Sequence, residues 1–181
     1  ISGELKPATA ETVKTAVEEA LEKIPEDTPA ELAFYGGSFT AIPVEEQIQL
    51  LEAAQPFIKS GRIAEIRMST RPDAIDEQCL ERLKRYGVRT IELGAQSMDD
   101  GVLRASGRGH SAADTECASG LIKKQGFKLV LQMMTGLPGD TEEKAIATAR
   151  KLISLSPDGV RVYPTVILRD TALYSLWKAG R

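Results

Sequence analysis

The chain has 181 residues, 42% of them hydrophobic and 27% charged, which suffices for one well-packed core and is short for two, so we expect a single domain over residues 1–181. Its formal net charge of −3 argues against a surface dominated by phosphate binding, which needs clustered lysine and arginine in excess. No run approaches the roughly 18 apolar residues of a membrane span, and the amino terminus lacks a signal-peptide pattern, so we expect a cytoplasmic protein without a membrane partner, its oligomeric state left open.

The first half of the chain alternates helical and strand-like patterns. Apolar residues at helical spacing predict a helix over residues 9–24, and a proline-rich break follows it. A short apolar run over 31–35 predicts a strand that ends at a glycine pair, after which Pro43 can open a second helix. Residues 64–68 predict the next strand, and the helix after it ends at Gly87.

The second half repeats this alternation. Apolar runs predict strands over 88–93, 127–134 and 160–163, and helical spacing predicts helices over 111–126, from about 142 onward, and over 171–179. Ser111 is suited to cap the first of these helices. The segment from Asp140 to Glu143 matches the carboxylate variant of a capping box, with Asp140 as the cap. Residues 94–110 are expected to form a loop.

Five strands separated by helices predict an α/β fold with right-handed βα units and an all-parallel sheet. Periodicity alone does not separate a doubly wound open sheet from a barrel. The barrel is favoured because unusual residues follow every strand at its carboxyl end. These signatures are Gly36-Gly37-Ser38-Phe39-Thr40, Ser69-Thr70-Arg71, Gln96-Ser97, Gln132 with Thr135-Gly136, and Arg161 with Tyr163.

Because the carboxyl ends of parallel strands share one edge, these signatures predict one binding site. The pair Gly36-Gly37 lets a ligand approach backbone amide and carbonyl groups, although an ordinary turn would explain it too. Arg71 and Arg108 can each grip a carboxylate through two hydrogen bonds. The alternative for Arg71 is an ion pair with Asp73 or Asp76, and for Arg108 a solvated loop charge.

Several common active sites are excluded by what the sequence lacks. The only histidine, His110, stands beside loop glycines and is expected at the surface or as a helix cap, so no Ser-His-Asp set can be built. The phosphate-loop pattern is absent. Cys79 and Cys117 lie on predicted helices far apart and are expected to be small buried hydrophobic residues, with no metal site in this chain.

Six motifs, in this order, resemble the radical S-adenosylmethionine (SAM) domain of the elongator catalytic subunit and its shorter bacterial relatives. They cover nearly the whole chain. They are Phe34 to Thr40, Ser69 to Asp73, Glu92 to Ser97, Gly107 to His110, Met133 to Gly139, and Val162 to Ile167 continuing through Leu176 to Arg181.

This resemblance implies a partial (β/α)6 TIM-like barrel in which three cysteines after the first strand hold a [4Fe–4S] cluster that SAM chelates. Those cysteines are absent here. A segment like Ile1-Ser2-Gly3 follows the last cysteine in the shorter relatives, so we expect the first strand and the cluster loop to precede Ile1 in a longer parent protein.

The resemblance also implies residue roles. Gly36, Gly37 and Ser38 match the motif that holds the SAM amino group, and Arg108 matches an arginine that meets the SAM carboxylate. The other expected cofactor-binding residues are Ser69, Arg71, Gln96, Ser97 and Gln132. Ser69 and Gln132 stand where related enzymes carry a glutamate and an aspartate. Arg161 and Tyr163 are expected on the substrate side.

The function so implied is a radical SAM enzyme core that generates a 5′-deoxyadenosyl radical, with tRNA wobble-uridine modification as the expected reaction and tRNA as a partner. Two alternatives stay open. The substrate could differ, for instance a tetrapyrrole, or this chain could be a noncatalytic barrel fragment that binds SAM or a partner.

Overall fold

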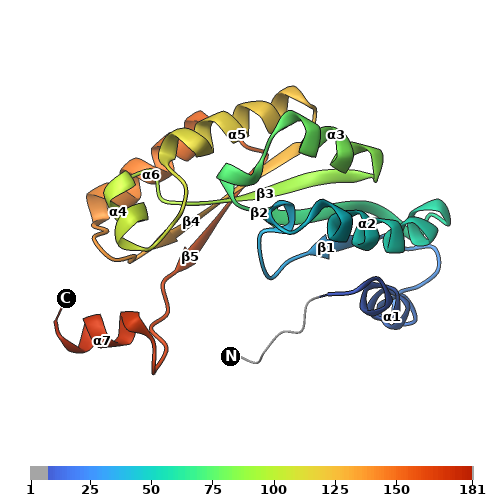
Figure 1. Cartoon of the computed structure of the whole chain (residues 1–181), viewed down its shortest axis with the longest axis horizontal. Helices are drawn as coiled ribbons and strands as arrows, with labels where there is room; N and C mark the ends of the chain where they lie inside the picture. The colour runs from blue at the N-terminus through green and yellow to red at the C-terminus, as the bar shows by residue number, and fades with distance from the viewer. Residues whose placement is uncertain (1–7, 181) are drawn as a thin grey trace.

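The computed structural model describes residues 8–180, which form alternating strands and helices (Figure 1). In chain order the elements are α1 (Ala10–Leu21), β1 (Ala30–Phe34), α2 (Val44–Lys59), β2 (Ile63–Thr70), α3 (Glu77–Arg85), β3 (Val88–Gln96), α4 (Asp100–Ala105), α5 (Ala112–Lys124), β4 (Lys128–Thr135), α6 (Glu142–Ser154), β5 (Gly159–Pro164) and α7 (Ala172–Lys178). Short 3-10 helices follow β1 at Phe39–Ala41 and β2 at Pro72–Ala74. The motif residues Ile1-Ser2-Gly3 and Arg181 lie outside the described residues, so the domain limits stay predictions.

The five strands are parallel and lie in the order β1-β2-β3-β4-β5. A doubly wound sheet reverses its strand order at a switch point, whereas this sheet adds each strand on the same side of the last. The sheet therefore curls in one direction into a partial TIM-like barrel, and the barrel prediction is confirmed. In Figure 1, α3, α5 and α6 run along one face of this curved sheet.

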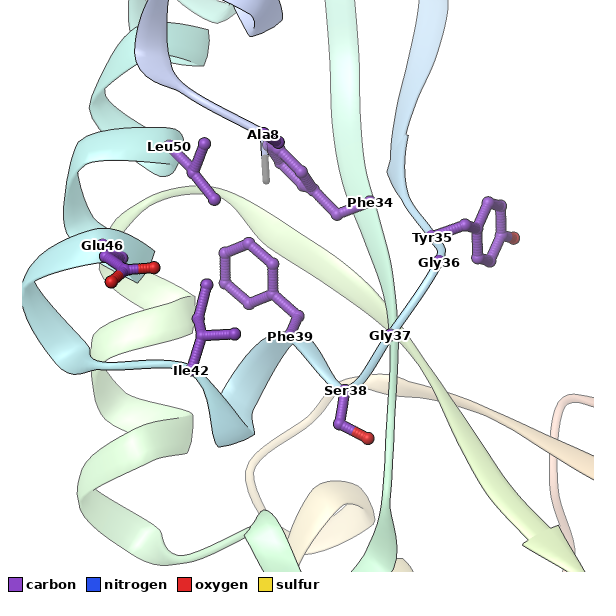
Figure 2. A pocket seen from close by; sticks show the side chains of 10 residues that line it. All are labelled: Ala8, Phe34, Tyr35, Gly36, Gly37, Ser38, Phe39, Ile42, Glu46 and Leu50. Carbon is purple, nitrogen blue, oxygen red and sulfur yellow. The ribbon is translucent and has the colours of Figure 1, made fainter. Parts of the chain in front are cut away.

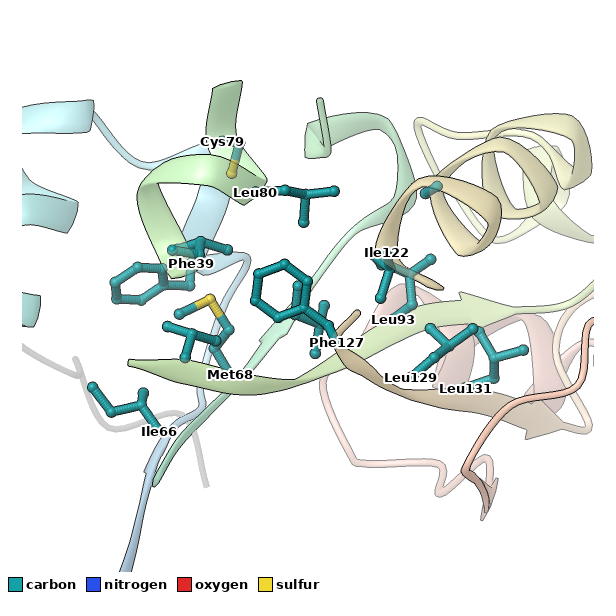
Figure 3. Close-up of a cluster of buried hydrophobic side chains, with 14 of the residues drawn as sticks. Phe39, Ile66, Met68, Cys79, Leu80, Leu93, Ile122, Phe127, Leu129 and Leu131 are labelled. Atoms are coloured by element: carbon teal, nitrogen blue, oxygen red, sulfur yellow. The ribbon is translucent and has the colours of Figure 1, made fainter. Parts of the chain in front are cut away.

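The core lies between the sheet and its helices, and α1 and α2 contribute to it as well as α3, α5 and α6. Alternate residues of the three central strands point to this side and are buried, as Met68 on β2, Leu93 on β3 and Leu131 on β4 show. They pack against helix residues such as Leu80 and Ile122 (Figure 3). The intervening residues of the same strands are largely polar and line the inner face of the half-barrel, which places the strands' chemistry on the side away from the core.

Polar caps fix the helix starts. Ser111 and Asp114 form a capping box at α5, as the predicted Ser111 cap requires. The cap prediction for α6 is wrong by one residue, because Thr141 accepts the hydrogen bond from the Lys144 amide. Asp140 instead accepts from the Gly136 amide at 3.0 Å and closes the turn after β4.

Other predicted elements match to within a few residues, with one omission. Helix α4 falls inside residues 94–110, which were expected to be a loop. Its six residues are too few to show helical periodicity, but Asp99 caps it by accepting from the Val102 amide. Among residues 8–180, no helix is long and apolar enough to cross a membrane.

Candidate functional site

A cavity of about 330 Å³ opens at the carboxyl ends of β2, β3 and β4. Its lining is mostly polar or glycine, and it includes residues from four of the five predicted signatures or their adjoining loops. The lining residues are Gly37, Ser38, Ser69, Thr70, Arg71, Gly94, Gln96, Gly107, Arg108, Gly109, His110 and Gln132. The structure therefore brings most of the sequence-predicted residues to one mouth of the half-barrel.

The glycine loop after β1 forms one wall of this cavity. Gly36 has a φ of +104°, a conformation that favours glycine, whereas a Cβ at Gly37 would meet no atom within 4 Å, so this backbone is open to a ligand. The Ser69 hydroxyl donates to the Gly37 carbonyl at 3.3 Å. The buried Gln47 amide holds the following turn by donating to the carbonyls of Thr40 and Ile42.

The same loop also lines a second, more apolar pocket of about 330 Å³ on the other side of β1. Figure 2 shows Phe39, Ile42 and Leu50 around this pocket, while the Tyr35 ring points to the opposite side from Phe34. Gly36 belongs to this pocket and adjoins the first cavity through Gly37. The loop at Gly37 and Ser38 thus borders both cavities.

Gln96 reaches the cavity through an unusual backbone turn. Its φ is +63°, and the Ser97 amide donates to the Ala95 carbonyl at 2.7 Å, which makes Gln96 the centre of a strained γ-turn. A Cβ at Gly94 would lie 2.8 Å from the Gln96 side-chain nitrogen, so glycine at 94 leaves room for the carboxamide. The turn aims a polar side chain into the site.

His110 stabilises this turn from behind. Its Nε2 lies 3.0 Å from the Ala95 carbonyl, and because a carbonyl only accepts, Nε2 carries the proton. The expectation of a surface position is wrong, since His110 is only 8% exposed. The loop glycines beside His110 predict an exposed position, and the sequence does not show that the imidazole donates a hydrogen bond to the distant Ala95 carbonyl.

Ser97 does not line the cavity. It is buried on the helix side, where its hydroxyl lies 3.3 Å from that of Thr148 and accepts from the Asp99 amide at 3.1 Å. The turn at Gln96 sends the next side chain to the opposite face. Ser97 therefore supports the loop between β3 and α4.

The two predicted arginines differ in their partners. Arg71 forms a two-pronged ion pair with Asp73, with Nε 2.6 Å from Oδ1, and this hydrogen bonding lowers the pKa of Asp73. The ion-pair alternative for Arg71 is thereby confirmed. Arg108 has no carboxylate partner among residues 8–180, and its Nη2 contacts the Met134 sulfur at 3.7 Å. Arg108 keeps a positive charge available to a ligand.

Sequence reasoning missed the residue at the centre of the inner face, Glu92. Its side chain is fully buried, yet it accepts from Arg67 at 2.9 Å and Gln132 at 2.8 Å, and it accepts a short bond from the Tyr35 hydroxyl. Arg161 Nη2 lies 3.0 Å away. The available signal was a charged residue between the apolar residues Ile91 and Leu93 of a strand.

Hydrogen bonding keeps this buried carboxylate ionised. Burial opposes ionisation of Glu92, but the hydrogen bonds from Tyr35, Arg67 and Gln132 and the charge of Arg161 outweigh it, so the pKa of Glu92 is lowered. Burial, and then the hydrogen bond to Glu92, raise the pKa of Tyr35. Tyr35 therefore stays a neutral donor.

The predicted substrate-side residues lie beside this cluster. Arg161 and Tyr163 share the inner face of β5, and Arg161 Nη1 lies 3.4 Å from the Tyr163 hydroxyl. Gln132 joins the two regions, since it lines the cavity and donates to Glu92. Gln132 thus connects the lining of the cavity to the Glu92 cluster of the inner face.

The cavity offers polar and charged groups for a ligand, while the described residues offer no metal site. An unpaired guanidinium, open backbone and carboxamides match a ligand with an amino-acid end. Cys79 on α3 is buried as expected, but Cys117 on α5 is exposed, so the burial expectation is wrong for it. Within residues 8–180, no group of three histidine, cysteine or acidic residues could hold a metal ion.

The sheet is parallel, its strand order does not reverse, and a polar cavity lies at the carboxyl ends of its strands. These features define the class of partial TIM-like barrel enzymes. The chain belongs to the radical SAM superfamily, whose family model matches residues 3–152. That superfamily implies SAM and a [4Fe–4S] cluster as cofactors.

Within this superfamily, the chain is similar to several named proteins. The tRNA uridine(34) acetyltransferase of Methanocaldococcus infernus is 31% identical over 183 residues, which cover 90% of this chain and 34% of that protein. Human Elongator complex protein 3 is 33% identical over 171 residues, which cover 83% and 31%. A structure of the M. infernus Elp3 lacking its residues 1–46 aligns with a TM-score of 0.78 at 29% identity, covering 94% of this chain and 45% of that one. The chain spans about a third of the length of these curated relatives.

Proposed function

We propose that this chain is the SAM-binding core of a radical enzyme that modifies the wobble uridine of tRNA. The observation that carries the proposal is the cavity at the mouth of the half-barrel, where Arg108 offers an unpaired guanidinium beside the open backbone of Gly37 and the carboxamide of Gln96. The tRNA part of the proposal is supported by relatives named tRNA uridine(34) acetyltransferase.

In this proposal Arg108 binds the SAM carboxylate, and Gly36, Gly37 and Ser38 receive the amino group through backbone carbonyls and a hydroxyl. Arg71 is held by Asp73 and contributes less charge than Arg108. Ser69 and Gln132 supply neutral polar groups on the floor. When bound, SAM supplies the carbon-radical chemistry from which the superfamily takes its name.

The [4Fe–4S] cluster requires ligands that the described residues do not provide. We therefore propose, from the family resemblance, that its cysteines precede Ile1 in the parent protein. In this proposal the chain's own residues bind SAM and hold it in one orientation.

Isothermal titration calorimetry of SAM with the cluster-loaded full-length protein tests the proposal. Replacing Arg108 by Ala removes a charge-assisted contact to the ligand carboxylate, which costs about 2 kcal/mol, or roughly a thirty-fold loss of affinity. Arg71→Ala should cost less, because Arg71 already has a carboxylate partner.

Arg89→Ala is a matched control, because Arg89 is an exposed arginine at the amino end of β3, the far end of the strand from the cavity. Its SAM affinity should equal that of the wild type. If Arg108→Ala also binds like the wild type, Arg108 is a solvated loop charge and the SAM orientation proposed here is wrong.

A further inference from the structure

Two tyrosines and an arginine lie together, partly exposed, on the inner face of the half-barrel. Tyr35 is 51% exposed and Tyr163 is 42% exposed, although both hydroxyl groups have partners within the barrel. Arg161 lies between them, its guanidinium carbon 5.9 Å from the centre of the Tyr35 ring. The rings are thus positioned by their polar ends. Arg161 lies over one face of the Tyr35 ring, and the remaining ring surfaces and the guanidinium are partly exposed.

The buried carboxylate of Glu92 fixes this surface. Glu92 binds the Tyr35 hydroxyl and lies 3.0 Å from Arg161 Nη2, and Arg161 Nη2 lies 3.4 Å from the Tyr35 hydroxyl. Tyr35 follows β1 whereas Arg161 belongs to β5, so the contact spans the opening of the half-barrel from the first strand to the last. A ligand meets side chains that are already ordered, which lowers the entropy cost of binding.

Such a surface suits a flat ring that carries hydrogen-bond acceptors. Aromatic rings and guanidinium planes stack on the faces of nucleobases, and enzymes that act on a base take it out of its stack to reach it. Uracil adds two carbonyl oxygens, which Arg161 and Gln132 can meet as donors. Gln132 also lines the SAM cavity, so a base at this surface would lie next to the cofactor proposed there.

We propose that Tyr35, Arg161 and Tyr163 form the subsite that stacks the target nucleobase, with Glu92 as the positioning residue that holds them. This inference rests on the proposed function and names its substrate subsite. Exposed aromatic residues elsewhere, such as Trp177 on α7, have no comparable buried anchor.

The test measures how much affinity depends on the base itself. Fluorescence anisotropy gives the Kd of the full-length protein for a labelled anticodon stem-loop RNA with uridine at the wobble position, and for the same RNA with an abasic site there. Stacking of one base should make the uridine RNA bind about ten-fold more tightly in the wild type.

Tyr163→Ala and Tyr35→Ala should bring this ratio close to one, while the affinity for the abasic RNA stays unchanged. Tyr163→Leu keeps apolar volume but has no ring and should lose the ratio as well, whereas Tyr163→Phe should keep it. Trp177→Ala is the matched control, an exposed aromatic residue outside the subsite, and should retain the wild-type ratio.

Two negative outcomes differ in meaning. A wild-type ratio near one would overturn the tRNA substrate and the subsite together. A ten-fold wild-type ratio that survives in Tyr163→Ala, Tyr163→Leu and Tyr35→Ala would leave the tRNA proposal standing and refute the stacking subsite.

Discussion

Replacing Glu92 by Ala should destabilise the protein more than most single substitutions on its surface. The change removes the one acceptor shared by Tyr35, Arg67, Gln132 and Arg161. Removing one partner of a buried charged cluster leaves the remaining groups without compensation.

The size of the loss in unfolding free energy depends on whether each former partner of Glu92 finds another hydrogen-bond partner. Arg67 keeps its 3.0 Å ion pair with Glu31, and Arg161 and Tyr35 are about half-exposed and can turn to water. The losses that persist are about two hydrogen bonds to a charged group, at roughly 1.5 kcal/mol each. We therefore expect a loss of about 3 kcal/mol, which lowers Tm by about 9 °C in a domain of this size.

Thermal and urea unfolding followed by circular dichroism measure this difference. Thr90→Val is the matched control, because Thr90 is buried on the same strand and its hydroxyl has no hydrogen-bond partner in the described structure. It should leave stability unchanged or raise it slightly. A Glu92→Ala protein as stable as Thr90→Val would show that the cluster contributes nothing, and the reasoning from its hydrogen bonds would fail.

Two further predictions concern acid and the turn at Gln96. Folding lowers the pKa of Glu92, so the stability that its ionised form contributes is fully present above the unfolded pKa of about 4.3 and is lost as the pH falls through the folded pKa. The difference in unfolding free energy between wild type and Glu92→Gln should therefore shrink below about pH 4. A constant difference down to about pH 2 would contradict the lowered pKa. Gln96→Gly relieves a left-handed backbone that Gln96→Ala keeps, so the Tm of Gln96→Gly should be higher than that of Gln96→Ala. SAM affinity measured by calorimetry should fall in both variants. Equal Tm values would argue against strain at this turn.

Local sequence signals predicted the elements because their causes are local. Apolar spacing, Gly87 and Ser111 are visible in a short window, and five strand-helix repeats leave few topologies. The common mouth was predictable for the same reason, because parallel strands all end at one edge. Arg71, Gln96 and Gln132 needed only that rule to be placed together.

The misses depend on contacts between distant segments. Glu92 interacts with residues from 25 to 69 positions away, and nothing near it in sequence names those partners. His110 is buried because the turn at Ala95 needs a donor, and the turn itself was not foreseeable. Cys117 lies on the outward side of α5, although its neighbours Ala118 and Ser119 are buried.

Successive side chains of a strand point to opposite faces of the sheet, so the residues that pack the core and the residues that face the inside of the half-barrel are different ones. Met68, Leu93 and Leu131 face the helices and determine whether the chain folds, whereas residues one position away, such as Glu92 and Gln132, face the inside of the half-barrel. Substitutions on the inner face can therefore change which molecule is accommodated while the outer layer still packs. A lineage can in this way acquire new substrates by altering one face of the sheet and keeping the other, without passing through an unfolded ancestor.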